Sequence, residues 1–366
     1  MALNLVRNSK VFFTTNVDAT SGVVDIGALE SAKTFEIQVL DGFTFSQNTT
    51  QDTVTINEAG VAPVRGQRSF NTSLEPVNFS MNTYIRPHMS GANVAAEESV
   101  LWGALSSVTG DGWTAGAPAT VDFDASNAHQ LQKFGLVIIL DNVTYVIDDC
   151  VLTQATIDFG IDAIATIAWT GQGKILRKLA TNATASAGTF GGGLTGAYTP
   201  KNTTAPYLAN KLSTATVTKG GVTYQVALTG GSITINNNVT YLTPANLGVV
   251  NQPATYFTGT RAISGSMTAY LKTGGSTDTG ALLATMLADT SNVEPKFNTV
   301  ITIGGNNAIK VALEMPTTML TIPTIDVQQV VSTTINFTAQ GSTSGNPTDS
   351  YDISQANELT VKYYAA

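Results

Sequence analysis

The chain of 366 residues is long enough for two domains of ordinary size, each with its own hydrophobic core. Charged residues make up only 12% of it, and 26 acidic against 18 basic residues give a formal net charge of −8. The low charge suits β-structure or a surface covered by other subunits, and the acidic balance argues against sequence-specific DNA binding, which needs a basic face.

The N-terminal residues 1–7 contain no sustained apolar stretch, so we expect no signal peptide. The longest purely aliphatic run, residues 136–140, is far too short to cross a bilayer as a helix. A single cysteine, Cys150, cannot form an intrachain disulfide, and its apolar surroundings predict a small core residue. The chain is expected to be made and kept in the cytosol, or assembled from it.

Strand-like alternation dominates the chain. Residues 34–39 alternate strictly and stop at Asp41-Gly42, and residues 222–228 are their counterpart, stopping at Gly230-Gly231. Residues 136–140 and 143–147 predict a hairpin, and residues 300–303 and 308–311 predict the same hairpin with a longer turn. Long polar stretches, 46–73 and 236–260, lie between strands, and we expect them to contact a neighbouring molecule.

Two short helices are predicted. The first lies near residues 95–107 and the second near 280–288. Each carries apolar residues on one face, as a helix packed on a sheet requires. The predicted face of the first consists of Val100, Leu101, Ala104 and Leu105, and that of the second of Leu282, Leu283, Met286 and Leu287.

Two pairs of matching segments occur in the same order. Residues 80–86 and 266–272 both read Ser-Met-x-x-Tyr-aliphatic-basic, and residues 169–173 and 337–341 both read aromatic-Thr-x-Gln-Gly. The pairs predict a duplicated domain. The offsets between the copies fall from 186 at Met81 and Met267 to 168 at Trp169 and Phe337. The first copy therefore carries extra residues, placed in a surface loop at 110–130, and residues 180–206 are expected to be a linker with little structure.

Residues 191–196 fit the spacing G-x-G-x-x-G, but no strand is predicted before them and Pro200 follows, so dinucleotide binding is not expected. Asp122-x-Asp124 begins like a calcium loop, but Asn127 and Lys133 replace the glycine and the glutamate that such a loop needs.

The titratable side chains also predict no active site. His88 and His129 lie far apart without metal-ligand spacing, and no nucleophile elbow supports a Ser-His-Asp site. We expect the acidic residues of the strand-like runs to line a wetted sheet face; these are Asp148, Asp149, Asp158, Asp162 and Asp326. No catalytic, cofactor-binding or metal-binding residue is therefore predicted.

The combination of features resembles the tail tube proteins of tailed bacteriophages. It comprises alternating strands, a long polar loop, the Ser-Met-x-x-Tyr strand, one helix, a hairpin and the aromatic-Thr-x-Gln-Gly strand, and it covers most of residues 10–178 and 207–366. The resemblance implies a mainly β fold with two tandem duplicated β-sandwich/barrel domains, each with one short α-helix and a long polar loop. The expected division is 1–179, a linker at 180–206, and 207–366.

The same resemblance implies a structural subunit, not an enzyme, in the virion tail. Three chains would form a pseudo-hexameric ring, and stacked rings would pass DNA without specific binding, with tape measure, tail terminator and baseplate or tip proteins as further partners and no membrane contact. The candidate strands for the lumen are 33–39 and 156–169 with their second-copy counterparts. The alternatives are a secreted or surface β-domain protein such as an adhesin or surface-layer module, a β-scaffold carbohydrate-active enzyme using a pair such as Asp158 and Asp162, and a tail sheath or fibre protein.

Overall fold

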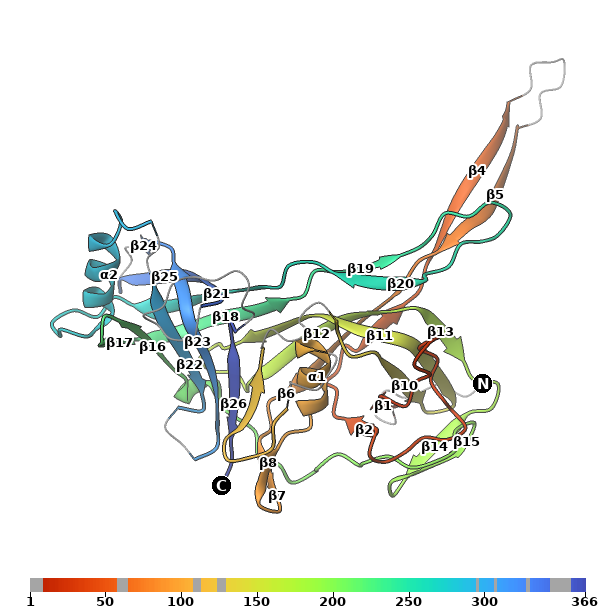
Figure 1. Cartoon of the computed structure of the whole chain (residues 1–366), viewed down its shortest axis with the longest axis horizontal. Helices are drawn as coiled ribbons and strands as arrows, with labels where there is room; N and C mark the ends of the chain where they lie inside the picture. The colour runs from red at the N-terminus through yellow and green to blue at the C-terminus, as the bar shows by residue number, and fades with distance from the viewer. Residues whose placement is uncertain are drawn as a thin grey trace.

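The computed structural model describes residues 9–57, 65–107, 113–123, 130–293, 296–305, 308–326, 330–342 and 357–366. In these ranges the chain consists mainly of antiparallel strands with two α-helices, which confirms the mainly β fold class (Figure 1). The elements up to residue 192 are β1 (Ser9–Thr14), β2 (Thr34–Ile37), β3 (Thr44–Ser46), β4 (Thr49–Asn57), β5 (Arg65–Leu74), β6 (Val77–Tyr84), β7 (His88–Ser90), β8 (Asn93–Ala95), α1 (Ser99–Ser106), β9 (Ala119–Asp122), β10 (Phe134–Leu140), β11 (Val143–Asp158), β12 (Thr166–Gly173), β13 (Ile175–Lys178), β14 (Ala183–Ser186) and β15 (Thr189–Gly192). Those that follow are a 3₁₀ turn (Asn210–Leu212), β16 (Thr214–Lys219), β17 (Val222–Val226), β18 (Leu228–Asn236), β19 (Val239–Leu242), β20 (Thr255–Thr258), β21 (Ala262–Tyr270), α2 (Thr279–Ala288), β22 (Phe297–Ile303), β23 (Lys310–Leu320), β24 (Thr324–Asp326), β25 (Ser332–Ala339) and β26 (Thr360–Tyr364).

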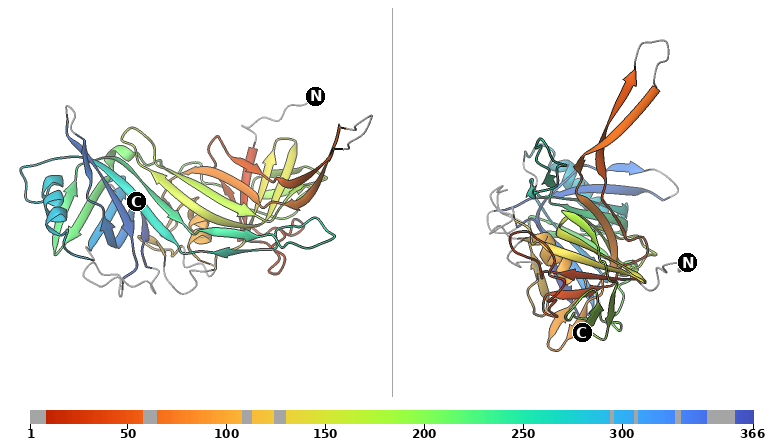
Figure 2. Two further views of the ribbon diagram at one scale, coloured as in Figure 1. Left: turned by 90° about the horizontal axis from the view of Figure 1, so that it is seen from above. Right: turned by 90° about the vertical axis from the view of Figure 1, so that its right-hand side faces the viewer.

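One long antiparallel sheet runs through both halves of the molecule. Among the described residues it contains eight strands in the order β3, β6, β12, β11, β18, β21, β25 and β24, with the end of β23 also paired to β25. The halves join where Gln154 lies opposite Asn236 and Asp158 opposite Ser232. Figure 2 shows these central strands side by side in the view from above. The polar groups of the backbone are therefore paired across the boundary between the halves.

A second layer of strands covers one face of the long sheet in each half. In the first half it pairs β2 with β1, β1 with β10, β10 with β11, and β11 with β13. In the second half it pairs β17 with β16, β16 with β22, β22 with β23, and β23 with β26. The long strands β11 and β23 each pass from this layer into the long sheet. Both expected hairpins, β10–β11 and β22–β23, are confirmed in the described residues.

The core fills the space between the layers, because alternate residues of the long sheet are apolar and point toward it. Trp102 and Trp169 meet there edge to face with ring centroids 5.1 Å apart. The Trp169 indole Nε1–H donates a 2.9 Å hydrogen bond to Thr83 Oγ1, which satisfies its polar atom in the apolar interior.

Glycine and phenylalanine exchange places between the two halves. Phe79 on β6 lies opposite Gly171 on β12, whereas in the second half the glycine is Gly265 on β21 and the phenylalanine is Phe337 on β25. A Cβ at Gly171 would lie 2.2 Å from the Phe79 ring and 2.6 Å from the Val151 carbonyl oxygen. The ring fits only because its partner has no side chain.

The register between these strands also differs between the halves. Met81 lies opposite Trp169, while Met267 lies opposite Ile335 rather than Phe337, a shift of two residues from the sequence match. A shift by an even number keeps each side chain on its original face, so both aromatic side chains remain in the core.

The expected helices are present. The first is shorter than predicted and the second begins one residue earlier. In α1, Leu101, Ala104 and Leu105 are buried as expected. In α2, Leu282 and Met286 are buried, but Leu287 is half exposed. Neither helix in the described ranges is long and apolar enough to cross a membrane.

Residues 180–206 are not the unstructured connection that their composition predicted. They form the hairpin β14–β15 and return along the first half, where Leu29 and Gly196 form a parallel bridge. Leu194 and Tyr198 are buried in a small separate core with Phe12. The prediction was wrong because the small and polar residues that suggested flexibility are interrupted by these apolar anchors.

The segment 110–130 was expected to be a surface loop. Its described part, residues 113–123 and 130, contains β9, which pairs with the C-terminal strand β26. Val121 is fully buried, and the Trp113 and Tyr363 rings are 5.0 Å apart. This segment of the first half therefore contributes a strand beside the second half, which the mixed composition of the loop did not reveal.

Candidate functional site

The face of the long sheet that points away from the core is polar along most of its length, with Met319, opposite Thr338, as an exposed apolar exception. In β6, β12 and β25 every second residue is buried, and those between them are polar or small. We call this surface the polar sheet face. It consists of Thr44, Ser46, Asn78, Ser80, Asn82, Tyr84, Gln154, Thr156, Asp158, Thr166, Ala168, Thr170, Gln172, Ser232, Thr234, Asn236, Ser264, Ser266, Thr268, Tyr270, Thr324, Ser332, Thr334, Asn336 and Thr338.

Hydroxyl and amide side chains on neighbouring strands of this face bond to one another. The Thr44 and Ser80 hydroxyl oxygens are 2.7 Å apart at one end of the sheet. The Thr156 and Thr234 hydroxyl oxygens are 3.2 Å apart where the halves meet. Such cross-strand pairs stabilise the register and hold a continuous layer of neutral polar groups.

Charge is nearly absent from the polar sheet face. Within its described side chains Asp158 is the one ionised group, and neither lysine nor arginine occurs there. A surface of this kind offers hydrogen bonds to water but no cation for a phosphate. The residues were individually visible in the sequence, but the pairing that assembles them into one surface was not.

Two hairpin arms project beside the long sheet. The stretches 46–73 and 236–260, expected to be polar loops, form β4–β5 and β19–β20; in Figure 1 the second arm runs toward the base of the first, which rises more steeply. The arms touch, because the Leu74 N–H donates to the Asn251 carbonyl at 2.7 Å and the Asn251 N–H donates to the Thr72 carbonyl at 3.2 Å. The polar composition had hidden their strand pairing.

Both arms carry exposed apolar side chains. Leu247 at the turn of the second arm is fully exposed. Beside it, Val249 is 63% exposed and Val250 is 50% exposed. On the first arm Val54 and Phe70 are about half exposed. An apolar cluster at the end of a projecting arm is typical of a surface that contacts another protein.

The acidic residues of β11 have two different environments. Asp148 and Asp149 are buried, so the expectation that they line a wetted sheet face was wrong. Asp148 forms an ion pair with Arg177, and Asp149 lies 3.1 Å from Lys133 Nζ. These pairs offset the cost of burying the charges. Asp158 is exposed on the sheet face, as expected, whereas Asp162 is exposed but lies in the turn between β11 and β12. The side chain of Asp326 lies outside the described residues.

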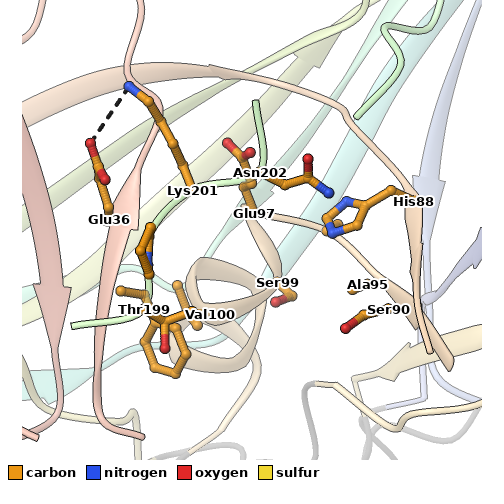
Figure 3. A pocket seen from close by; sticks show the side chains of 13 residues that line it. Glu36, His88, Ser90, Ala95, Glu97, Ser99, Val100, Thr199, Lys201 and Asn202 are labelled. Atoms are coloured by element: carbon orange, nitrogen blue, oxygen red, sulfur yellow. Dashed lines mark ion pairs between the residues drawn. The ribbon is translucent and has the colours of Figure 1, made fainter. Parts of the chain in front are cut away.

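A small cavity of about 220 Å³ lies between α1 and residues 199–202. Figure 3 shows Glu36 and Lys201 on one side of it, 3.6 Å apart between Oε1 and Nζ, and His88 on the other. The His88 ring nitrogen Nδ1 lies 3.2 Å from the Arg86 carbonyl oxygen. No hydrogen bond of the described residues joins His88 to a serine hydroxyl, so the cavity has no nucleophile and base in contact.

The other sequence candidates are not brought together. Burial raises the pKa of the Cys150 thiol, as expected of a core cysteine. Asp122 accepts a hydrogen bond from Thr360, while Asp124, Asn127 and His129 lie outside the described residues. Gly191 and Gly192 belong to β15 and are not followed by a helix. The described residues contain no group of three potential metal ligands.

The strands proposed for a lumen are separated by the structure. Residues 156–169 are not one strand, because β11 ends at Asp158 and β12 begins at Thr166, but both parts lie in the long sheet. Residues 33–39 contain β2, which pairs with β1 in the second layer. In the second half, the expected stop at Gly230-Gly231 is wrong, because both glycines lie inside β18 next to a register shift.

Comparison with known proteins agrees with this architecture. A family model described as "Phage tail tube protein" matches residues 88–339. The tail tube protein pb6 of Escherichia phage T5 is 32% identical to the chain over 360 residues, which cover 93% of this chain and 73% of pb6.

Proposed function

The chain belongs to the phage tail tube protein family, and from this membership we propose that three copies close into a ring and that stacked rings form a conduit for DNA. A protein of this family is a structural component of the virion tail. The observation that carries the proposal is the polar sheet face, which continues across both halves of the chain. A sheet with one dry and one wet face suits the wall of a water-filled tube.

The proposed ring rests on an internal duplication, with copies at 1–179 and 207–366 joined by 180–206. The recurrence of the same strand neighbours in both halves supports it. Three chains would then present six similar units around the axis. The ring should look sixfold along the long sheet and threefold where β9 and the hairpin β14–β15 lie.

Simple geometry decides whether such a ring could pass DNA. Three copies of eight strands give 24, and at a spacing of about 4.8 Å and a tilt of about 40° they close to a diameter of about 48 Å. Removing about 5 Å of side chain from each wall leaves an opening of about 38 Å. A duplex with grooves about 8 Å deep is about 20 Å across, so it would pass with a layer of water.

The charges of the polar sheet face support the same role. Each contact between a lysine or arginine and a phosphate releases counterions and so holds the DNA in place. A wall with neutral hydroxyl and amide groups and Asp158 would avoid such contacts. The net charge of −8 acts in the same direction.

The hairpin arms are the proposed contacts between successive rings. The two arms contact each other, and the second ends in the apolar cluster around Leu247 and Val249, which would be covered by the next ring. At one end of the tube the free arms, and at the other end the surface that receives them, would meet tail terminator and baseplate or tip proteins. A tape measure protein would occupy the lumen during assembly.

Electron microscopy and sedimentation of the purified protein test the proposal. We expect rings of three chains with a sixfold-like outline, and stacks of them at high concentration. Monomers at every concentration, or rings without a sixfold-like outline, would overturn it.

A further inference from the structure

The two outer edges of the long sheet are unpaired within the described part of the chain. At one end β3 pairs with β6 alone, and at the other β24 pairs with β25 alone. Unpaired strand edges can add another strand and are usually protected unless they are used. Both edges here belong to a sheet whose polar face suits a closed barrel, in which no edge remains free.

The junction between the halves shows how such edges can join. There β18 adds antiparallel to the end of β11 through five residue pairs, from Gln154 and Asn236 to Asp158 and Ser232. The strand β18 leads into the arm β19–β20, just as β3 leads into the arm β4–β5. The strand β11 follows β10 in a hairpin, just as β23 follows β22. In its place along the chain, the end of β23 with β24 therefore corresponds to the end of β11. In the same way, β3 corresponds to β18.

The sheet edge at β24 carries exposed apolar side chains. Three apolar side chains follow one another along this edge and are nearly half exposed: Met319 at 44%, Ile322 at 48% and Ile325 at 44%. A cavity of about 350 Å³ is lined by Met319 and Ile322 together with Met286 and Phe297. Apolar residues gathered at one sheet edge are typical of a surface covered in the assembly.

In the first half, the corresponding region at the end of α1 is covered by residues of the second half. Asn237, which follows β18, donates from Nδ2 to the Leu105 carbonyl in the last turn of α1 at 2.8 Å. The Tyr256 hydroxyl on the second arm donates to the Leu131 carbonyl at 2.8 Å. The base of an arm thus covers the end of α1, whereas the end of α2 borders the open cavity.

We propose, on the basis of the proposed ring, that β3 of one copy adds antiparallel to the β23–β24 edge of the next copy, with Thr44 opposite Thr324. The base of the first arm then covers the cavity beside α2. Three such contacts close the barrel, and each reproduces the β11–β18 junction already present within every chain.

The position of Thr324 follows from the matching segments. In the junction Asp158 pairs with Thr166 on its other side. The match of Trp169 with Phe337 places Thr334 at the position of Thr166, and Thr334 pairs with Thr324. Thr324 therefore occupies the position in the second half that Asp158 occupies in the first.

The position of Thr44 follows in the same way. The junction residue Ser232 pairs with Ser266 on its other side. The match of Met81 with Met267 places Ser80 at the position of Ser266, and Ser80 pairs with Thr44. Both threonines are exposed on the polar sheet face, so their side chains point to the same side of the joined sheet.

Disulfide cross-linking of the full chain tests the contact. The variant T44C/T324C, oxidised as assembled rings, should give covalent dimers and trimers on a non-reducing gel. The native Cys150 stays in every variant because it is buried. Both substitutions lie at exposed edge positions, where a cysteine disturbs no packing.

Three matched variants make the result specific. T156C/T234C spans the internal junction and should cross-link within one chain, without covalent oligomers, whether or not rings form. T44C/I325C places the second thiol on the opposite face of the strand and should give at least tenfold less oligomer, because disulfides need Cβ atoms about 3.5–4.5 Å apart. S46C/T324C tests a slip by two residues.

The outcomes separate this contact from the proposed function. Rings in which T44C/T324C cross-links no better than T44C/I325C would overturn the edge pairing and leave the ring in place. Rings in which S46C/T324C cross-links best would overturn the register. A protein that stays monomeric, with T156C/T234C still cross-linked inside the chain, would overturn the ring itself.

Discussion

Replacing Glu98 by glutamine is expected to remove a large pH dependence of stability. Glu98 directly precedes α1 and is buried, with Oε1 accepting a 3.2 Å hydrogen bond from the Arg86 backbone N–H. Burial disfavours the charged carboxylate and raises the pKa of Glu98 from 4.5 to about 7.

The sign and size of the effect follow from proton linkage. Between pH 4.5 and about 7 the unfolded chain has released the Glu98 proton while the folded chain keeps it. Stability therefore falls as the pH rises through this window and levels off above it. A shift of about 2.5 pKa units at about 1.4 kcal/mol each corresponds to a loss of about 3 kcal/mol.

Urea unfolding of the wild-type chain and of Glu98→Gln at pH values from 4.5 to 8.5 measures this loss. Groups distant from Glu98 titrate alike in both proteins, so the difference between their free energies of unfolding reports mainly on Glu98. The variant should gain about 3 kcal/mol relative to wild type between the two ends of the range. Glu30→Gln, which removes the same charge from an exposed position, should show no such change. A constant difference between Glu98→Gln and wild type would refute the reasoning.

Three further substitutions test the packing, the wall and the arms. Gly171→Ala should lower the free energy of unfolding by about 1–3 kcal/mol, because the new Cβ meets a phenylalanine ring and a backbone carbonyl. Gly160→Ala is the control: its Cβ has nothing within 4 Å, so the same urea titration should show a change of less than about 0.5 kcal/mol. In a filter-binding assay, assembled tubes of Asp158→Lys should retain duplex DNA at about 50 mM salt and release it at about 200 mM. Asp162→Lys makes the same charge change outside the polar sheet face and should leave the retention of DNA unchanged. Leu247→Asp should leave single rings intact but shorten their stacks in electron micrographs, and stacks of wild-type length would exclude the second arm from the contact between rings.

The strands that the sequence predicted correctly are those with local signals. The hairpin β10–β11 was recognisable because two apolar runs flank Asp141-Asn142, and Asp141 indeed has a positive φ of 49°. The burial of Leu282 and Met286 followed from their spacing of four along α2. In each case the information lies within a few neighbouring residues.

Predictions failed where distant residues decide the structure. Nothing near Val121 shows that it will pair with Val361, more than two hundred positions away. Asp148 and Asp149 looked solvated because the ion pairs that permit their burial come from Arg177 and Lys133. A pairing signal for the arms existed in the alternating residues of 239–242, but their polar composition concealed it.

The sequence by itself determined the mainly β fold class, the neutral polar surface, the two short helices and the resemblance to tail tube proteins. All of these depend on composition, alternation and short matching segments, which are properties of neighbouring residues. Only the tertiary structure decided that one sheet continues through both halves, which of its faces is mainly polar, and which edges remain unpaired. These features depend on hydrogen bonds between strands far apart in the chain, such as β11 and β18, and no local pattern specifies such a partner.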